Sequence, residues 1–101
     1  MKFKSKIGKI IELTQERKNH IFEFHPDIKE YFSKIPQVLK EPDQIRKSKY
    51  DPEVLLFYKY FANIKEGKYL TVVVKIDKRS FILTSYLTDK IITGEKIYEK
   101  K

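Results

Sequence analysis

Apolar and polar residues alternate with a period of two along most of the second half of the chain. Four runs there are rich in β-branched and aromatic residues, and short polar connections separate them. Such residues favour strands, in which successive side chains point to opposite faces. The pattern predicts four antiparallel strands within DQIRKSKY (43–50), VLLFYKYFA (54–62), KYLTVVVKID (68–77) and RSFILTSYLT (79–88).

The first half lacks this alternation and carries helix signals instead. Thr14 is a suitable N-cap for a helix over residues 15–24, and Pro26 ends that helix because the residue before a proline is driven out of the helical region. A second short helix is predicted over residues 27–36, starting from Pro26 and stopping near Pro36.

The order of these elements predicts the fold class. The opening KFKSKIGKIIEL favours a short strand or a hairpin turned at Gly8. We therefore expect an α+β fold in which an N-terminal strand and helices pack on one face of a four-stranded antiparallel β-sheet. A chain of this length suits one domain, 1–101, to which residues 1–10 and 96–101 can be peripheral.

Period two also assigns the faces of the predicted strands. The residues expected to point into the core are Ile45, Leu55, Phe57, Phe61, Leu70, Val72, Val74, Ile76, Phe81, Leu83, Ser85 and Leu87. Those expected on the solvent face are Arg46, Ser48, Tyr58, Tyr60, Tyr69, Thr71, Lys75, Ile82, Thr84, Tyr86 and Thr88. Cations and phenols thus alternate on the solvent face.

Charge and composition limit the classes of molecule that the protein is expected to bind. The chain has 22 Lys+Arg against 14 Asp+Glu, a net charge of +8. This excess favours a polyanionic partner, either nucleic acid or an acidic protein, although a lysine-rich solvated surface explains it equally well. Tyrosine can stack on unpaired bases, but it is also simply a good strand residue. The absence of cysteine and of an apolar run of about 20 residues predicts a cytosolic protein without redox chemistry.

The two histidines are the candidate chemical groups. His20 and His25 stand five residues apart, which on an ideal helix separates their side chains by about 140°. Because Pro26 forces His25 into the extended end of the helix, its ring can turn toward the edge that His20 occupies. The spacing is not that of a metal site. Two imidazoles beside cations suit RNA cleavage, which needs a base, an acid and stabilisation of phosphate charge.

Several motifs in order carry a resemblance to a known family. They are T-x-E-R-x-x-H-I-x-x-x-H-P from Thr14, Y-L-x-V-V-V-K from Tyr69 and T-x-Y-L-T-D from Thr84. As a set they resemble the phage-associated branch of the barnase, EndoU, colicin D and RelE-like nuclease fold over residues 11–95. The resemblance implies helices on a four-stranded antiparallel sheet and metal-independent RNA cleavage without a cofactor. It also implies a toxin whose partners are RNA and an acidic antitoxin, with no membrane.

The resemblance and the predicted face together assign the site. His20 and His25 would transfer protons, with acid and base undecided. The remaining candidates are Arg46 and Lys75 for phosphate charge, Tyr58 and Tyr86 for orienting or stacking, Thr84 for the scissile phosphate, and Lys59, Tyr60 and Ser48 for further RNA contacts. Lys59 falls on the core side by alternation. The chain departs from the family at Phe24, where a basic residue usually precedes the second histidine.

Two alternatives stay open. The first is a noncatalytic RNA-binding or protein-interaction domain that keeps the fold, which would bind RNA in a salt-dependent way and leave it intact. The second is a DNA-binding regulator, which the sequence favours less because no helix-turn-helix with a basic recognition helix is apparent.

Overall fold

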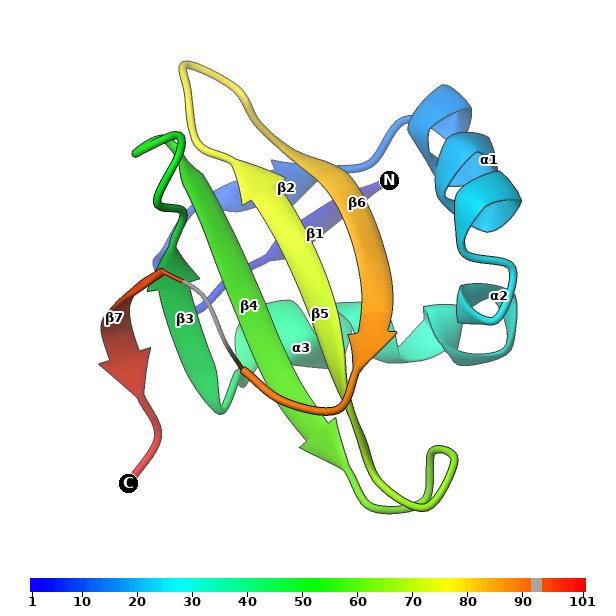
Figure 1. Cartoon of the computed structure of the whole chain (residues 1–101). Coiled ribbons are helices and arrows are strands. Elements are labelled where there is room, and N and C mark those ends of the chain that lie inside the picture. Colours follow the sequence, from blue (N-terminus) through cyan, green and yellow to red (C-terminus); the bar gives the residue numbers. More distant parts are fainter. Residues whose placement is uncertain (92–93) are drawn as a thin grey trace.

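The strands of this computed structural model form one sheet, shown in Figure 1. The structure describes residues 1–91 and 94–101, and in them the sheet has seven strands in the order β1-β2-β6-β5-β4-β3-β7. The strands are β1 (Lys2–Lys4), β2 (Ile10–Glu12), β3 (Gln44–Lys47), β4 (Val54–Phe61), β5 (Lys68–Lys75), β6 (Ser80–Thr88) and β7 (Glu95–Glu99).

The predicted four-stranded antiparallel sheet is wrong, although the class is still mixed α+β. The four predicted strands exist as β3 to β6 and pair antiparallel. The sheet continues beyond them, because β2 adds to β6 in parallel through Ile11 and Ser80, and β7 adds to the other edge along β3. β2 has three residues and β7 has five, too few to show a period, and the strands beside which they add, β6 and β3, are distant in sequence.

The N-terminal hairpin is confirmed. β1 and β2 pair antiparallel with Phe3 opposite Ile11, and Gly8 in their connection has φ +80°. Glycine adopts this left-handed conformation without the steric cost that a side chain would add. Residues 1–10 and 96–101 therefore contribute the strands at the two ends of the sheet.

The first helix is confirmed as well. α1 (Gln15–Phe24) begins after Thr14, whose hydroxyl accepts a hydrogen bond from the Arg17 backbone at 3.1 Å. His25 has left the helical region, with φ −133° and ψ 70°, as expected for a residue that precedes Pro26. Its backbone N–H still donates to the Ile21 carbonyl at 2.7 Å and so closes the helix.

The second predicted helix, over residues 27–36, is wrong in its boundaries. The chain forms α2 (Ile28–Tyr31), a 3₁₀ turn η1 (Phe32–Lys34) and then α3 (Ile35–Lys40). Pro36 lies in the first turn of α3, so it starts a helix rather than ending one. Proline suits that position because the first-turn amide has no partner within the helix and the fixed φ is already helical.

The core lies between one face of the sheet and the helices. α3 passes behind β4 and β5 in Figure 1 and contributes Ile35, Val38 and Leu39, all fully buried. The sheet residues of this core are Ile11, Ile45, Leu55, Phe57, Leu70, Val72, Val74 and Ile82. We call the opposite side, turned to the viewer in Figure 1, the outer face.

A β-bulge corrects the predicted faces of β6. Val73 pairs with Thr84 but Val74 pairs with Ile82, which leaves Leu83 as an extra residue in the ladder. The alternation therefore reverses, so Ile82 is buried in the core and Phe81 is not. A bulge depends on the neighbouring strand, so a period counted along one strand cannot show it.

The molecule has a radius of gyration of 12.5 Å, close to the value of about 13 Å expected for a compact domain of 100 residues. None of the helices in the described residues has the length and apolar character needed to cross a lipid bilayer.

Candidate functional site

Helix α1 lies along the edge of β6 that faces away from β5, beyond the short stretch that β2 covers. β2 pairs only with the start of β6, at Ser80 and Phe81, and α1 contacts the strand from the same side (Figure 1). Ile21 anchors the helix because it is 1% exposed within the core cluster. The sheet therefore holds α1 so that its C-terminal end lies next to the second half of β6.

This packing brings the two histidines to one hollow. His20 and His25 line it together with Arg17, Phe24, Leu83 and Thr84, and its volume is about 320 Å³. We call it the histidine hollow. The His20 ring lies 4.6 Å from the Phe24 ring, centroid to centroid. His20 lies within α1 and His25 is its C-cap, so one helix end brings both rings to a hollow that Leu83 and Thr84 of β6 also line.

A row of hydroxyl-bearing residues crosses the outer face beside the hollow. Tyr58 of β4, Thr71 of β5 and Tyr86 of β6 are direct cross-strand neighbours, and we call them the tyrosine row. The His25 ring lies 5.8 Å from the Tyr86 ring, which connects the row to the histidine hollow. The row was expected in solvent, but Tyr58 is 1% exposed, with its ring 6.3 Å from the Tyr69 ring, and Thr71 is fully buried.

Burial raises the pKa of both phenols above the ordinary value of 10.0, so they stay protonated well into the alkaline range. It raises the pKa of Tyr58 from 10.0 to about 12, with the neighbouring Tyr86 adding to the rise and the positive charge of Arg46 opposing it. Burial is also the main cause that raises the pKa of Tyr86. The two hydroxyls therefore act as hydrogen-bond donors and acceptors, and proton transfer near neutral pH is left to the histidines.

The Tyr58 pKa predicts an alkaline limit to stability. The pKa of Tyr58 is higher in the folded state than in the unfolded state. The contribution of its neutral hydroxyl to the free energy of unfolding is therefore complete below pH 10 and is lost as the pH rises through about 12. Two pKa units correspond to about 3 kcal/mol. Urea unfolding at increasing pH should show this loss for the parent and a smaller one for Tyr58→Phe. Tyr50→Phe is the control, since Tyr50 is 93% exposed. If both variants changed the alkaline loss of stability equally, that loss would not come from the buried Tyr58 hydroxyl.

Arg46 lies on the outer face beside Tyr58, and its guanidinium is held by its own chain. Its Nε donates to the Gln44 side chain at 3.0 Å and its Nη1 donates to the Gly94 carbonyl at 3.1 Å. Both acceptors are neutral, so the positive charge of Arg46 is retained at the edge of the tyrosine row. This matches the face predicted for it.

Lys75 also lies on the outer face, but two carboxylates neutralise it. Its ammonium is 2.5 Å from Asp51 and 3.5 Å from Glu53. The hydrogen bond to Asp51 is the main cause that raises the pKa of Lys75, and the same contact lowers the pKa of Asp51. A phosphate would have to displace Asp51 to reach this lysine, and so would a carboxylate of an antitoxin.

Three predicted RNA contacts are placed elsewhere. Lys59 is on the core face and only 8% exposed, and its ammonium donates to the Glu41 carbonyl at 2.8 Å, so the chain rather than a phosphate holds it. Ser48 accepts from the Tyr50 backbone within the β3–β4 turn. Tyr60 is exposed near the end of β4, where its ring packs 5.3 Å from the Tyr69 ring. None of the three lines the histidine hollow.

Arg17 is the functional candidate that the sequence reasoning missed. It lines the histidine hollow and forms no ion pair with a carboxylate in the part of the chain that the structure describes. Helical spacing could have found it, because residues three or four apart share a helix face and Arg17, His20 and Phe24 have that spacing. Arg17 is thus a cation among the residues that line the hollow, where Phe24 stands in place of a basic residue before His25.

The described residues contain no cluster of three or more histidine, cysteine or acidic side chains that could hold a metal ion. Family models, curated proteins and solved structures were all compared with the chain, and none matches it. The resemblance to the nuclease fold therefore stays a prediction.

Proposed function

We propose that this protein is a metal-independent endoribonuclease that acts in the cytoplasm, of the toxin type that its motifs resemble. The observation that supports this most is the histidine hollow. It places two imidazoles, an arginine with no carboxylate partner among the described residues and a threonine hydroxyl around one open space. RNA cleavage by attack of the 2′-hydroxyl on the adjacent phosphodiester requires these groups.

The proposed reaction uses the RNA as its own nucleophile. One histidine removes the proton of the 2′-hydroxyl as its oxygen attacks the adjacent phosphorus. The bond from phosphorus to the 5′-oxygen breaks, and the other histidine gives that oxygen a proton. The products are a 2′,3′-cyclic phosphate and a free 5′-hydroxyl, so atoms and charges balance without a metal or cofactor. Which histidine is the base is left open.

The surrounding residues would stabilise the crowded phosphate. Arg17 lies on the helix face that carries His20, and its guanidinium can donate two parallel hydrogen bonds to phosphate oxygens. Thr84 lines the hollow and offers a hydroxyl to the same group. Tyr86, against which His25 packs, would limit the movement of that ring. Exposed Phe24 provides an aromatic face at the hollow for an unpaired base.

The second candidate is an RNA-binding domain without turnover. Two of the cations predicted to contact the RNA are engaged elsewhere, because Lys75 pairs with two carboxylates and Lys59 is buried. Fewer positive charges are therefore free to stabilise a transition state than the sequence suggested, which favours a domain without turnover. Such a domain would bind single-stranded RNA with an affinity that falls as salt rises, and it would leave the RNA intact.

Cleavage of a labelled single-stranded RNA in the presence of EDTA tests the proposal. We expect products that end in 2′,3′-cyclic phosphate, formed at the same rate with and without EDTA. Bound but intact RNA would support the second candidate. Cleavage that EDTA abolishes would contradict the proposed chemistry.

A further inference from the structure

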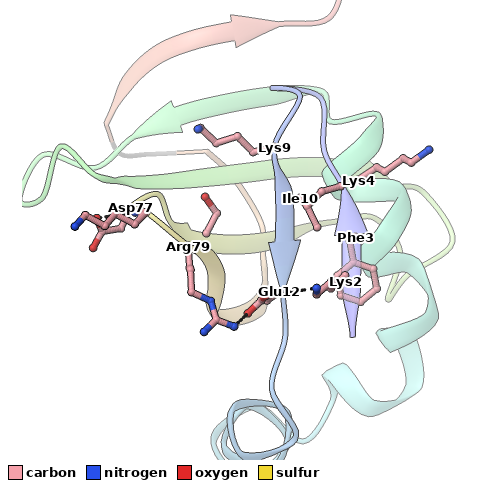
Figure 2. A pocket seen from close by; sticks show the side chains of 10 residues that line it. Lys2, Phe3, Lys4, Lys9, Ile10, Glu12, Asp77 and Arg79 are labelled. Atoms are coloured by element: carbon pink, nitrogen blue, oxygen red, sulfur yellow. Dashed lines mark hydrogen bonds and ion pairs between the residues drawn. The ribbon is translucent and has the colours of Figure 1, made fainter.

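The N-terminal hairpin forms one end of the sheet, and a second hollow lies there (Figure 2). Its volume is about 610 Å³, and β1, β2 and the β5–β6 turn surround it. The residues that line it are Lys2, Phe3, Lys4, Lys9, Ile10, Glu12, Asp77, Lys78, Arg79 and Ser80. We call it the basic hollow, because five cations line it against two carboxylates.

Both carboxylates are already engaged. Glu12 accepts from Arg79 at 2.7 Å and lies 4.0 Å from the Lys2 ammonium, as the dashed lines of Figure 2 show. Asp77 accepts a hydrogen bond from the Lys78 backbone at 2.7 Å and so stabilises the turn. The cations at this hollow are therefore only partly neutralised by their own chain.

Three lysines of the basic hollow have no carboxylate partner among the described residues. Lys4, Lys9 and Lys78 form no ion pair within the described ranges 1–91 and 94–101. Figure 2 shows Lys9 extending on the side of β2 where Arg79 and Asp77 lie, whereas Lys4 points the other way. Beside these charges Ile10 is 51% exposed. Cations next to exposed apolar surface suit a polyanion that also carries flat, apolar groups.

The basic hollow continues toward the histidine hollow. A smaller hollow shares Lys2, Glu12 and Arg79 with it and reaches Thr14, the N-cap of α1. Along β6, Ser80 lines the basic hollow and Thr84 lines the histidine hollow. Because Leu83 is an extra residue in the bulge, the two positions are about three strand steps, or about 10 Å, apart. One single-stranded nucleic acid could therefore contact both.

We propose that the basic hollow is a phosphate-binding subsite for the single-stranded RNA that is cleaved at the histidine hollow. It would hold the part of the strand that runs past the N-terminus of α1. This rests on the proposed ribonuclease function for the identity of the ligand, but its binding test does not require cleavage.

The test uses the full-length double variant Lys9→Gln/Lys78→Gln and a labelled single-stranded RNA of about 16 nucleotides. We expect the Kd to rise roughly tenfold at low salt and the slope of log Kd against log salt to fall by about 1.4, or about 0.7 for each lost phosphate contact. The matched control is Lys40→Gln/Lys100→Gln, which removes the same charge from exposed positions outside the hollow. It should change the Kd much less.

Cleavage of a long RNA and of a dinucleotide tests the subsite separately from the ribonuclease activity. The Lys9→Gln/Lys78→Gln variant should cleave the long RNA with a lower kcat/KM and should cleave a dinucleotide, which cannot span both hollows, at the parental rate. If the parent cleaves neither, the ribonuclease proposal fails, while the binding result still decides on the subsite.

Equal losses of RNA affinity in both double variants would overturn the subsite. Binding of poly-glutamate as tight as RNA at the same salt would also overturn it, because the hollow would then be a general polyanion surface.

Discussion

Replacing either histidine with alanine should reduce the rate of RNA cleavage by about 10²- to 10⁴-fold, the usual contribution of a positioned acid or base. His20 and His25 line the same hollow, and the proposed reaction uses both of them in one proton-transfer step. The double variant should therefore be little slower than the slower single variant, since either loss already removes the concerted proton transfer. Initial rates with labelled single-stranded RNA would measure this.

Folding must be separated from catalysis in these variants. His20 is exposed, so its replacement should leave the free energy of unfolding nearly unchanged. His25 is half-buried against Tyr86, so His25→Gln is a useful second variant that fills similar space. Asn19→Ala is the matched control, an exposed residue of α1 outside the hollow. Parental cleavage by folded His20→Ala and His25→Ala would rule out the assigned roles.

Phe57→Ala should reduce the free energy of unfolding by about 3–5 kcal/mol, the largest stability effect that we expect. Its ring is fully buried at the centre of the sheet, where it pairs with Ile45 and Val72 on the neighbouring strands and packs in the core cluster. The replacement removes that contact area and leaves a cavity that the two strands cannot close. Equilibrium unfolding in urea would measure the loss.

Phe24→Ala is the matched comparison, because it removes the same side chain from a position that is 63% exposed. We expect a change of within about 0.5 kcal/mol, as is usual for exposed positions. Similar losses for the two variants would contradict the core described here.

Local signals account for the parts of the structure that were predicted correctly. Thr14 and Pro26 define α1 because a cap and a proline act within one helical turn. The runs that became β3 to β6 contain enough residues for the period of two to be visible. Gly8 marks the hairpin turn, since its φ of +80° favours glycine.

The errors share a different cause. The bulge at Leu83 and the parallel pairing of β2 with β6 arise from contacts between strands, which alternation within one strand does not record. Alternation correctly placed Lys59 on the core side, whereas the resemblance had placed it among the RNA contacts. Its aliphatic stem can lie along the core face while its ammonium reaches a backbone carbonyl. Burial of Tyr58 likewise depends on the side chains of neighbouring strands.

The sequence by itself determined the local elements and the candidate chemistry: a capped helix ending at a histidine and proline, four strands, and an excess of positive charge. Only the tertiary structure decided which of these groups meet. It brought both histidines together with Arg17 and Thr84 by packing α1 against β6, and it neutralised Lys75 with Asp51. The physical reason is range, because capping and alternation act over a few residues, whereas a site is made by packing between segments far apart in the chain.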